Sequence, residues 1–168
     1  MEATGTTLIE AEPRAVLEWI LDLERYRQAD PKVGPVKEPV RLDEEGRGRV
    51  RYRGRLVGVP TPVDTQDVHL ERWHRLTLTG ASGVWTRWFV EFEGTFECER
   101  AGSGTQVTHR EHFRFKPRPL GWLMDRLLGR WLAGTMPGEM TRLAQLIEQD
   151  VANHSTADLT ATTGVEPS

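Results

Sequence analysis

The sequence predicts a two-layer α+β domain in which one long C-terminal helix covers a curved antiparallel sheet. Two observations lead to this fold class. Between residues 35 and 116, short runs that alternate apolar and polar residues are separated by turn residues, which is typical of consecutive antiparallel strands. After Pro117 and Pro119, apolar residues recur at helical spacing as far as Ile147. The expected order is a strand, two short helices, six further strands and the long helix, with about seven strands in all.

The N-terminal part begins with a strand expected at residues 4–10. A helix follows with Pro13 as its first residue, where the missing N–H of proline costs nothing. The helical part closes at Asp30-Pro31, because the residue before a proline avoids the helical region. The six strands that follow are expected at residues 36–42, 49–56, a run ending near 71, 75–81, 85–99 and 105–116. No helix is expected among these strands.

The C-terminal helix is expected from about residue 120 to residue 149, and Pro137-Gly138 should kink or break it. The segment after Val151 has no aromatic residue and few branched aliphatic residues. We therefore expect one domain over residues 1–150 and a disordered tail over residues 151–168.

Composition excludes several classes of protein. With 168 residues, 38% hydrophobic and 28% charged, the chain suits one domain with a core. The single cysteine, Cys98, excludes a disulfide framework and a cysteine-rich zinc site. The net charge of −3 gives no reason to expect nucleic acid as a partner. No apolar run suits a transmembrane helix, and the N-terminus does not look like a secretory signal, so a cytoplasmic location is expected.

Several segments together resemble one superfamily. They are Ala11-Glu12-Pro13 with Val16 and Trp19, residues 23–31 (LERYRQADP), residues 48–54 (GRVRYRG), residues 104–108 (GTQVT) and Arg142-Leu143. The chain resembles the START-like (SRPBCC) helix-grip proteins over about residues 3–150, and most of all the bacterial members named polyketide cyclase/dehydrase or lipid-transport-like. The resemblance implies a seven-stranded sheet that grips the C-terminal helix around a hydrophobic cavity. It does not imply one activity, because the superfamily includes lipid carriers, aromatase/cyclases, chaperone partners and oxygenase domains.

Strand alternation and helical spacing predict which side chains form the cavity wall. The predicted ligand-binding residues are Tyr52, Leu56, Leu76, Leu78, Trp88, Val90, Phe92, Phe113, Leu123, Leu127 and Trp131. The aromatic members would stack on a planar ligand, or they would simply fill the core.

The last strand carries the candidate catalytic pair. His109 and Glu111 are two residues apart on an otherwise apolar face, so their side chains lie roughly 7 Å apart on the same side. Such a pair in a cavity suits proton transfer on a bound carbonyl compound, whereas a buried structural pair is the alternative. A metal site of His109, Glu111 and His112 is not expected, because His112 faces the other way. No cofactor is expected either, since no motif marks a nucleotide, metal or nucleophile site.

Four arginines alternate along one predicted strand and point outward: Arg49, Arg51, Arg53 and Arg55. They would dock an acidic partner such as an acyl carrier protein, or they would form an ordinary solvated face paired with acidic neighbours.

Three functions remain open at this point. The first is a carrier or sequestering protein that binds a hydrophobic small molecule of aromatic or polyketide-like type. The second is a polyketide cyclase, aromatase or dehydratase that uses His109 and Glu111. The third is a protein-interaction module of the chaperone-partner type. A hydrogen-bonded His109–Glu111 pair that opens on a cavity would favour catalysis. An unoriented His109 in a sealed apolar core would favour binding alone.

Overall fold

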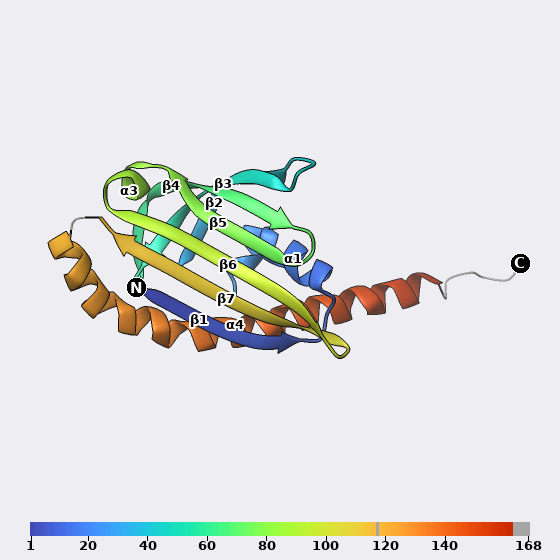
Figure 1. The fold of residues 1–168 in the computed structure, drawn as a ribbon. Coiled ribbons are helices and arrows are strands. Elements are labelled where there is room, and N and C mark those ends of the chain that lie inside the picture. Colours follow the sequence, from blue (N-terminus) through green and yellow to red (C-terminus); the bar gives the residue numbers. More distant parts are fainter. Residues whose placement is uncertain (117, 163–168) are drawn as a thin grey trace, which may run out of the picture.

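In the computed structural model of the chain, seven antiparallel strands of the described part form one sheet, in the order β1-β7-β6-β5-β4-β3-β2. The structure describes residues 1–116 and 118–162. For residues 84–85, 118–120, 125 and 155–162 it describes the backbone only. The strands are β1 (Glu2–Ile9), β2 (Val33–Leu42), β3 (Arg47–Leu56), β4 (Val59–Glu71), β5 (Arg75–Ser82), β6 (Val90–Ala101) and β7 (Gly104–Phe115). From β2 to β7 each strand pairs with the next one in the chain, and the first strand pairs with the last (Figure 1). The predicted α+β helix-grip architecture is confirmed.

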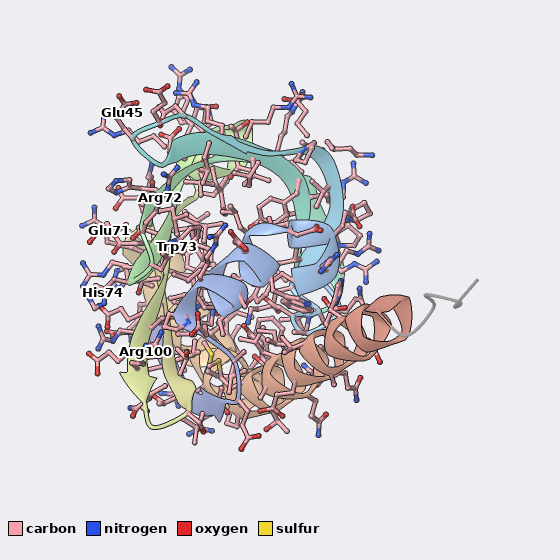
Figure 2. All side chains as sticks on the ribbon, turned by 90° about the vertical axis from the view of Figure 1, so that its right-hand side faces the viewer. Glu45, Glu71, Arg72, Trp73, His74 and Arg100 are labelled. Atoms are coloured by element: carbon pink, nitrogen blue, oxygen red, sulfur yellow. The ribbon has the colours of Figure 1, made fainter. Side chains whose placement is uncertain are left out.

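Within the described residues, four helices accompany the sheet: α1 (Pro13–Leu21), α2 (Leu23–Tyr26), α3 (Val84–Trp88) and α4 (Arg118–Thr162). Pro13 begins α1 as expected, and the Asp22 carboxylate accepts hydrogen bonds from two backbone N–H groups of α2, which caps that short helix. Seen end-on in Figure 2, the sheet curves around α1, α2 and α4. The concave face of the sheet is thus the face that meets the helices.

The core lies between that concave face and the helices. From the sheet it takes every second residue, as the alternation predicts: Val50, Val68, Leu70, Leu76, Phe96, Cys98 and Val107. From α4 it takes a stripe at helical spacing: Leu132, Met136, Met140, Leu143 and Ile147. Each large side chain buried in this way stabilises the fold by about 1.5–3 kcal/mol.

The short helix α3 contradicts the expectation of strands alone between residues 35 and 116. It replaces the start of the strand predicted at residue 85, and β6 begins at Val90. Lys116 holds it in place, since its ammonium donates to the carbonyl oxygens of Thr86 (2.7 Å) and Arg87 (3.1 Å) at the C-terminal end of α3. The Thr86 hydroxyl also donates to Asp64 on β4 at 3.0 Å. These contacts join residues about 20–30 positions apart, so a local pattern does not reveal them.

The helix α4 continues through Pro137 without the predicted break. Pro137 and Gly138 are exposed, so the carbonyl that loses its intrahelical donor lies on the solvent side. On the opposite side Met136 and Met140 are buried against the sheet and hold the two halves in one helix.

The end of α4 at Thr162 lies beyond the boundary predicted at residue 150. Residues 151–162, predicted as part of a disordered tail, are helical, and residues 163–168 lie outside the described residues. The division into a domain and a separate tail stays a prediction.

Candidate functional site

A cavity of about 110 Å³ lies between the concave face of the sheet and α4. The predicted ligand-binding residues that line it are Tyr52, Leu56, Leu78, Val90, Phe92, Phe113 and Trp131. Leu56 and Trp131 are partly exposed and Arg55 is exposed, so the cavity reaches the surface at this end. An apolar cavity of about 150 Å³ holds one benzene ring, so the space suits a single ring or a short aliphatic segment.

Four of the predicted wall residues do not line this cavity. Leu76 faces inward as expected but is fully buried in the core. Trp88 belongs to α3 rather than to β6, and its side chain is 62% exposed. Leu123 and Leu127 are 44% and 60% exposed, because the first turns of α4 extend past the end of β1 (Figure 1). Helical spacing predicts which face of a helix is apolar, but it does not predict whether a strand packs against that face.

His109 and Glu111 both line the cavity, as predicted, and both are almost completely buried. The carbonyl oxygen of Thr95 lies 3.0 Å from His109 Nδ1 and accepts its proton. The imidazole also stacks on the ring of Phe96, with parallel planes and centroids 3.9 Å apart. These two contacts fix the ring, and they direct Nε2 towards Glu139 Oε1 at 3.3 Å and Glu111 Oε1 at 3.6 Å.

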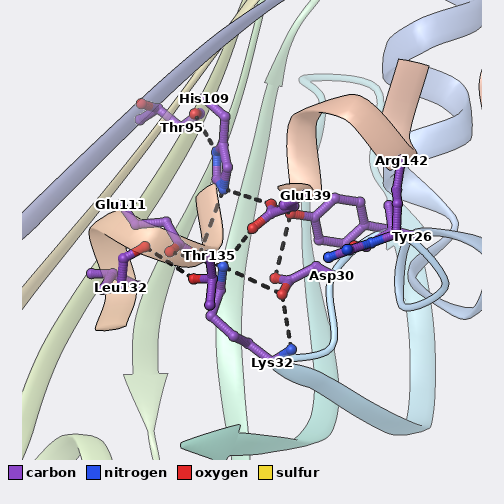
Figure 3. A network of polar contacts seen from close by, with 11 residues as sticks. Tyr26, Asp30, Lys32, Thr95, His109, Glu111, Leu132, Thr135, Glu139 and Arg142 are labelled. Atoms are coloured by element: carbon purple, nitrogen blue, oxygen red, sulfur yellow. Dashed lines mark hydrogen bonds and ion pairs between the residues drawn. The ribbon is translucent and has the colours of Figure 1, made fainter. Parts of the chain in front are cut away.

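Around this pair lies a larger cluster, which we call the buried polar cluster: Tyr26, Asp30, Lys32, His109, Glu111 and Glu139 (Figure 3). The Lys32 ammonium is its centre, with Glu139 Oε2 at 2.5 Å, Glu111 Oε2 at 3.2 Å and Asp30 Oδ1 at 3.3 Å. The Tyr26 hydroxyl donates to the other oxygen of Glu139. Residues from α2, from the segment before β2, from β7 and from α4 therefore converge on one charged site at the cavity wall.

Sequence reasoning missed Tyr26, Asp30, Lys32 and Glu139. A signal existed for Glu139, since it falls on the apolar stripe of α4 between Met136 and Leu143, where a carboxylate needs a partner. The partner, Lys32, lies 107 residues away, and nothing local links the two.

The cluster shifts the pKa values of its members. Burial and the charge of Glu139 raise the pKa of Asp30 to about 7, although Lys32 opposes the shift. Burial alone would lower the pKa of His109, but the neighbouring carboxylates of Glu111 and Glu139 raise it above its usual value. Burial would raise the pKa of Glu111, but His109 and Lys32 together lower it. The pKa of Lys32 is raised, because three carboxylates outweigh its burial. Near neutral pH, the Lys32 cation thus faces three carboxyl groups, of which Asp30 is close to its titration point.

His109, Glu111 and Glu139 bring their ligand atoms within 4.8 Å of one another, a spacing that would suit a metal ion. The Lys32 ammonium already lies within 3.2 Å of both carboxylates. The positive charge that this group of acceptors requires is therefore supplied by a side chain of the protein.

The two ends of the cavity differ in polarity. Along β7, Phe113 and Phe115 line the end that opens near α3, and Glu111 and His109 follow inward. The pairing of Phe92 with Phe113 and of Phe96 with His109 continues this gradient on β6. A ligand would therefore meet aromatic rings first and charged groups last.

The four arginines predicted on one face of β3 are exposed, but Arg55 follows an irregularity in the strand and also lines the cavity. Arg49 pairs with Asp67 at 2.8 Å and Arg51 with Glu38 at 2.9 Å. These pairs match the solvated, acid-paired face that was one of the two expectations for this strand.

A family model described as polyketide cyclase/dehydrase and lipid transport matches residues 1–148. The chain belongs to this family. No protein with a curated description matches significantly. This match confirms the expected resemblance to the polyketide cyclase/dehydrase and lipid-transport-like proteins, and a solved START superfamily structure shares the fold.

One similar structure is that of TTHA0849 from Thermus thermophilus, with 20% identity and a TM-score of 0.69 over 88% of this chain and 97% of that chain. A START superfamily protein from Mycobacterium smegmatis has 18% identity and a TM-score of 0.62 over 84% and 98%. The Zhui aromatase/cyclase from Streptomyces sp. R1128 has 18% identity and a TM-score of 0.57 over 96% and 90%. At these identities the likeness shows a common fold.

Among the described residues, no helix combines the length and the apolar character needed to cross a membrane.

Proposed function

We propose that the protein binds a hydrophobic small molecule in the cavity between the sheet and α4 and acts as its carrier or sequestering protein. The observation that supports this most is the cavity itself, since a protein interior is normally close-packed. Its wall of aliphatic and aromatic side chains, with Phe92 and Phe113 packed 4.9 Å apart, suits one ring of an aromatic or polyketide-like compound. A cytoplasmic location is part of the proposal.

A pair of tryptophan variants tests this proposal. Leu56 lines the cavity, and Val59, its partner across the β3–β4 hairpin, is 66% exposed and does not line it. Leu56→Trp should fill the entrance and weaken binding of the apolar probe 4-propyltoluene at least about tenfold, which corresponds to about 1.4 kcal/mol. Val59→Trp adds the same bulk next to it and should bind like the wild type. Ligand-observed NMR titration measures both. Equal affinities for both variants, or no binding to the wild type, would contradict the proposal.

A second candidate function, cyclisation or dehydration of a carbonyl compound, is favoured by the orientation of His109. Because Nδ1 donates to Thr95, the neutral ring carries its lone pair on Nε2, and the protonated ring is stabilised by Glu111 and Glu139. A ring held in this way beside a cavity suits a general acid or base. The aromatase/cyclase activity of structural relatives adds to the case.

For that candidate, His109→Gln and Glu111→Gln should each remove most turnover of a polyketide-like substrate, and the double variant should lose little more, because the pair acts as a unit. Binding of 4-propyltoluene should survive in all three. Full turnover in folded variants would exclude this role for the pair.

Docking of an acyl carrier protein at Arg49, Arg51, Arg53 and Arg55 remains a proposal that would accompany the cyclase function. Arg53 and Arg55 are the members best placed for it, because the other two already pair with Asp67 and Glu38.

A further inference from the structure

Tyr52 on β3 and Gln66 on β4 form a polar pair in the cavity wall, separate from the buried polar cluster. The Gln66 amide nitrogen donates to the Tyr52 hydroxyl at 2.8 Å. Gln66 is only 5% exposed, and its amide oxygen has no hydrogen-bond partner among the described residues. A buried acceptor without a partner is rare in folded proteins and points to a group that the cavity receives.

The pair offers the cavity one donor and one acceptor whichever way the amide is turned. With the amide nitrogen towards Tyr52, Gln66 Oε1 is an available acceptor and the Tyr52 O–H remains an available donor. With the amide turned over, Gln66 Oε1 would accept from Tyr52, leaving the amide NH₂ as donor and the tyrosine oxygen as acceptor. Both arrangements match a group that donates and accepts at one point, and a hydroxyl does this.

The surroundings favour a neutral hydroxyl over a carboxylate. Burial raises the pKa of Tyr52, and the charges of Asp30 and Glu111 raise it further, so the phenol keeps its proton at neutral pH. The Lys32 ammonium is already paired with three carboxyl groups, those of Asp30, Glu111 and Glu139, and is therefore not available to an anionic ligand.

We propose that Tyr52 and Gln66 form a subsite that binds a hydroxyl group of a neutral ligand, whose apolar body lies against Phe92 and Phe113. The inference rests on the proposed function, since it requires that the cavity binds a hydrophobic molecule. It adds the substrate class: a single-ring or ring-containing compound with a phenolic or alcoholic hydroxyl at its inner end.

Three probes of one shape test the subsite. 4-Propylphenol both donates and accepts, 4-propylanisole only accepts, and 4-propyltoluene does neither. The wild type should bind the phenol at least about tenfold more tightly than either of the other two, as measured by NMR titration or calorimetry.

The double variant Tyr52→Phe/Gln66→Met removes both polar groups with little change of volume, which leaves no unpaired partner behind and should therefore fold. Its preference for the phenol should vanish, while its affinity for 4-propyltoluene stays within about threefold of the wild type. Thr65→Val is the matched control, because Thr65 precedes Gln66 on β4 but pairs with the exposed Arg51 on the outer face. It should keep the full preference.

The outcomes separate the two proposals. If all three probes bind the wild type equally, the subsite is overturned and the cavity function stands; a water molecule then satisfies the pair. If the double variant keeps the preference, the hydroxyl is bound elsewhere and the subsite is overturned. If none of the probes binds the wild type, the cavity function fails and the subsite fails with it.

Discussion

At His109, three contacts of different kinds act on one ring. Thr95 fixes the protonated nitrogen, Phe96 holds the ring plane, and Glu139 and Glu111 face the other nitrogen. Strand alternation was sufficient to predict that His109 and Glu111 share an inner face, because that depends only on neighbours in the chain. The partners on α4 and on the segment before β2 depend on tertiary packing, which explains why alternation did not predict them.

The raised pKa of Asp30 leads to a pH-dependent stability. A carboxyl whose pKa is about 7 in the folded state and near 3.8 when unfolded holds its proton more tightly in the folded state. Its contribution to stability is therefore lost as the pH rises from about 4 to 7. His109, with a raised pKa, acts in the same direction from about pH 6.5 upwards.

We therefore expect the thermal midpoint of the wild type to fall more steeply between pH 5 and pH 8 than that of Asp30→Asn, which cannot titrate. For a chain of this size about 1 kcal/mol changes the midpoint by about 2–4 °C. Melting curves followed by circular dichroism measure the slopes. Asp67→Asn, which changes an exposed carboxylate on β4, is the control and should melt with the wild-type slope. Parallel slopes for wild type and Asp30→Asn would contradict the assignment.

Among the elements, α4 has two distinct roles. Its apolar stripe closes the core against the sheet, and Glu139 within that stripe reaches Lys32, His109 and Tyr26. Helical spacing predicted the stripe, but the expected break at Pro137 was wrong. A proline on the exposed side of a helix whose other side is buried costs less than the local rule assumes.

Glu139→Gln should destabilise the protein by about 3 kcal/mol, because Lys32 and His109 lose a buried countercharge. Glu148→Gln on the same helix is the control. It loses a charge at an exposed contact with the backbone of Glu10 and should change stability by less than about 0.5 kcal/mol. Urea unfolding gives both values. Similar small losses in the two variants would show that Glu139 is not a necessary member of the buried polar cluster.

Across the whole molecule, the cavity runs from an apolar entrance near α3 and the first turns of α4 to charged groups below Tyr52 and Gln66. The strands after residue 35 and their antiparallel pairing were predictable, because most of them alternate and most of the turns between them are short. The helix α3 was not predictable, since five residues with two tryptophans resemble a strand and Lys116 stabilises the helix from far along the chain. The entrance end was consequently the least well predicted part of the site.

We expect a hydrophobic ligand to lie inside this cavity and not on the exposed apolar side chains near its entrance. Intermolecular NOEs between 4-propyltoluene and the methyl groups of the isotope-labelled protein distinguish the two positions. A ligand in the cavity gives NOEs to the methyls of Leu56, Leu78 and Val90, which line it. NOEs confined to Val59 and Leu127, which are 66% and 60% exposed, would place the ligand on the surface and contradict binding in the cavity.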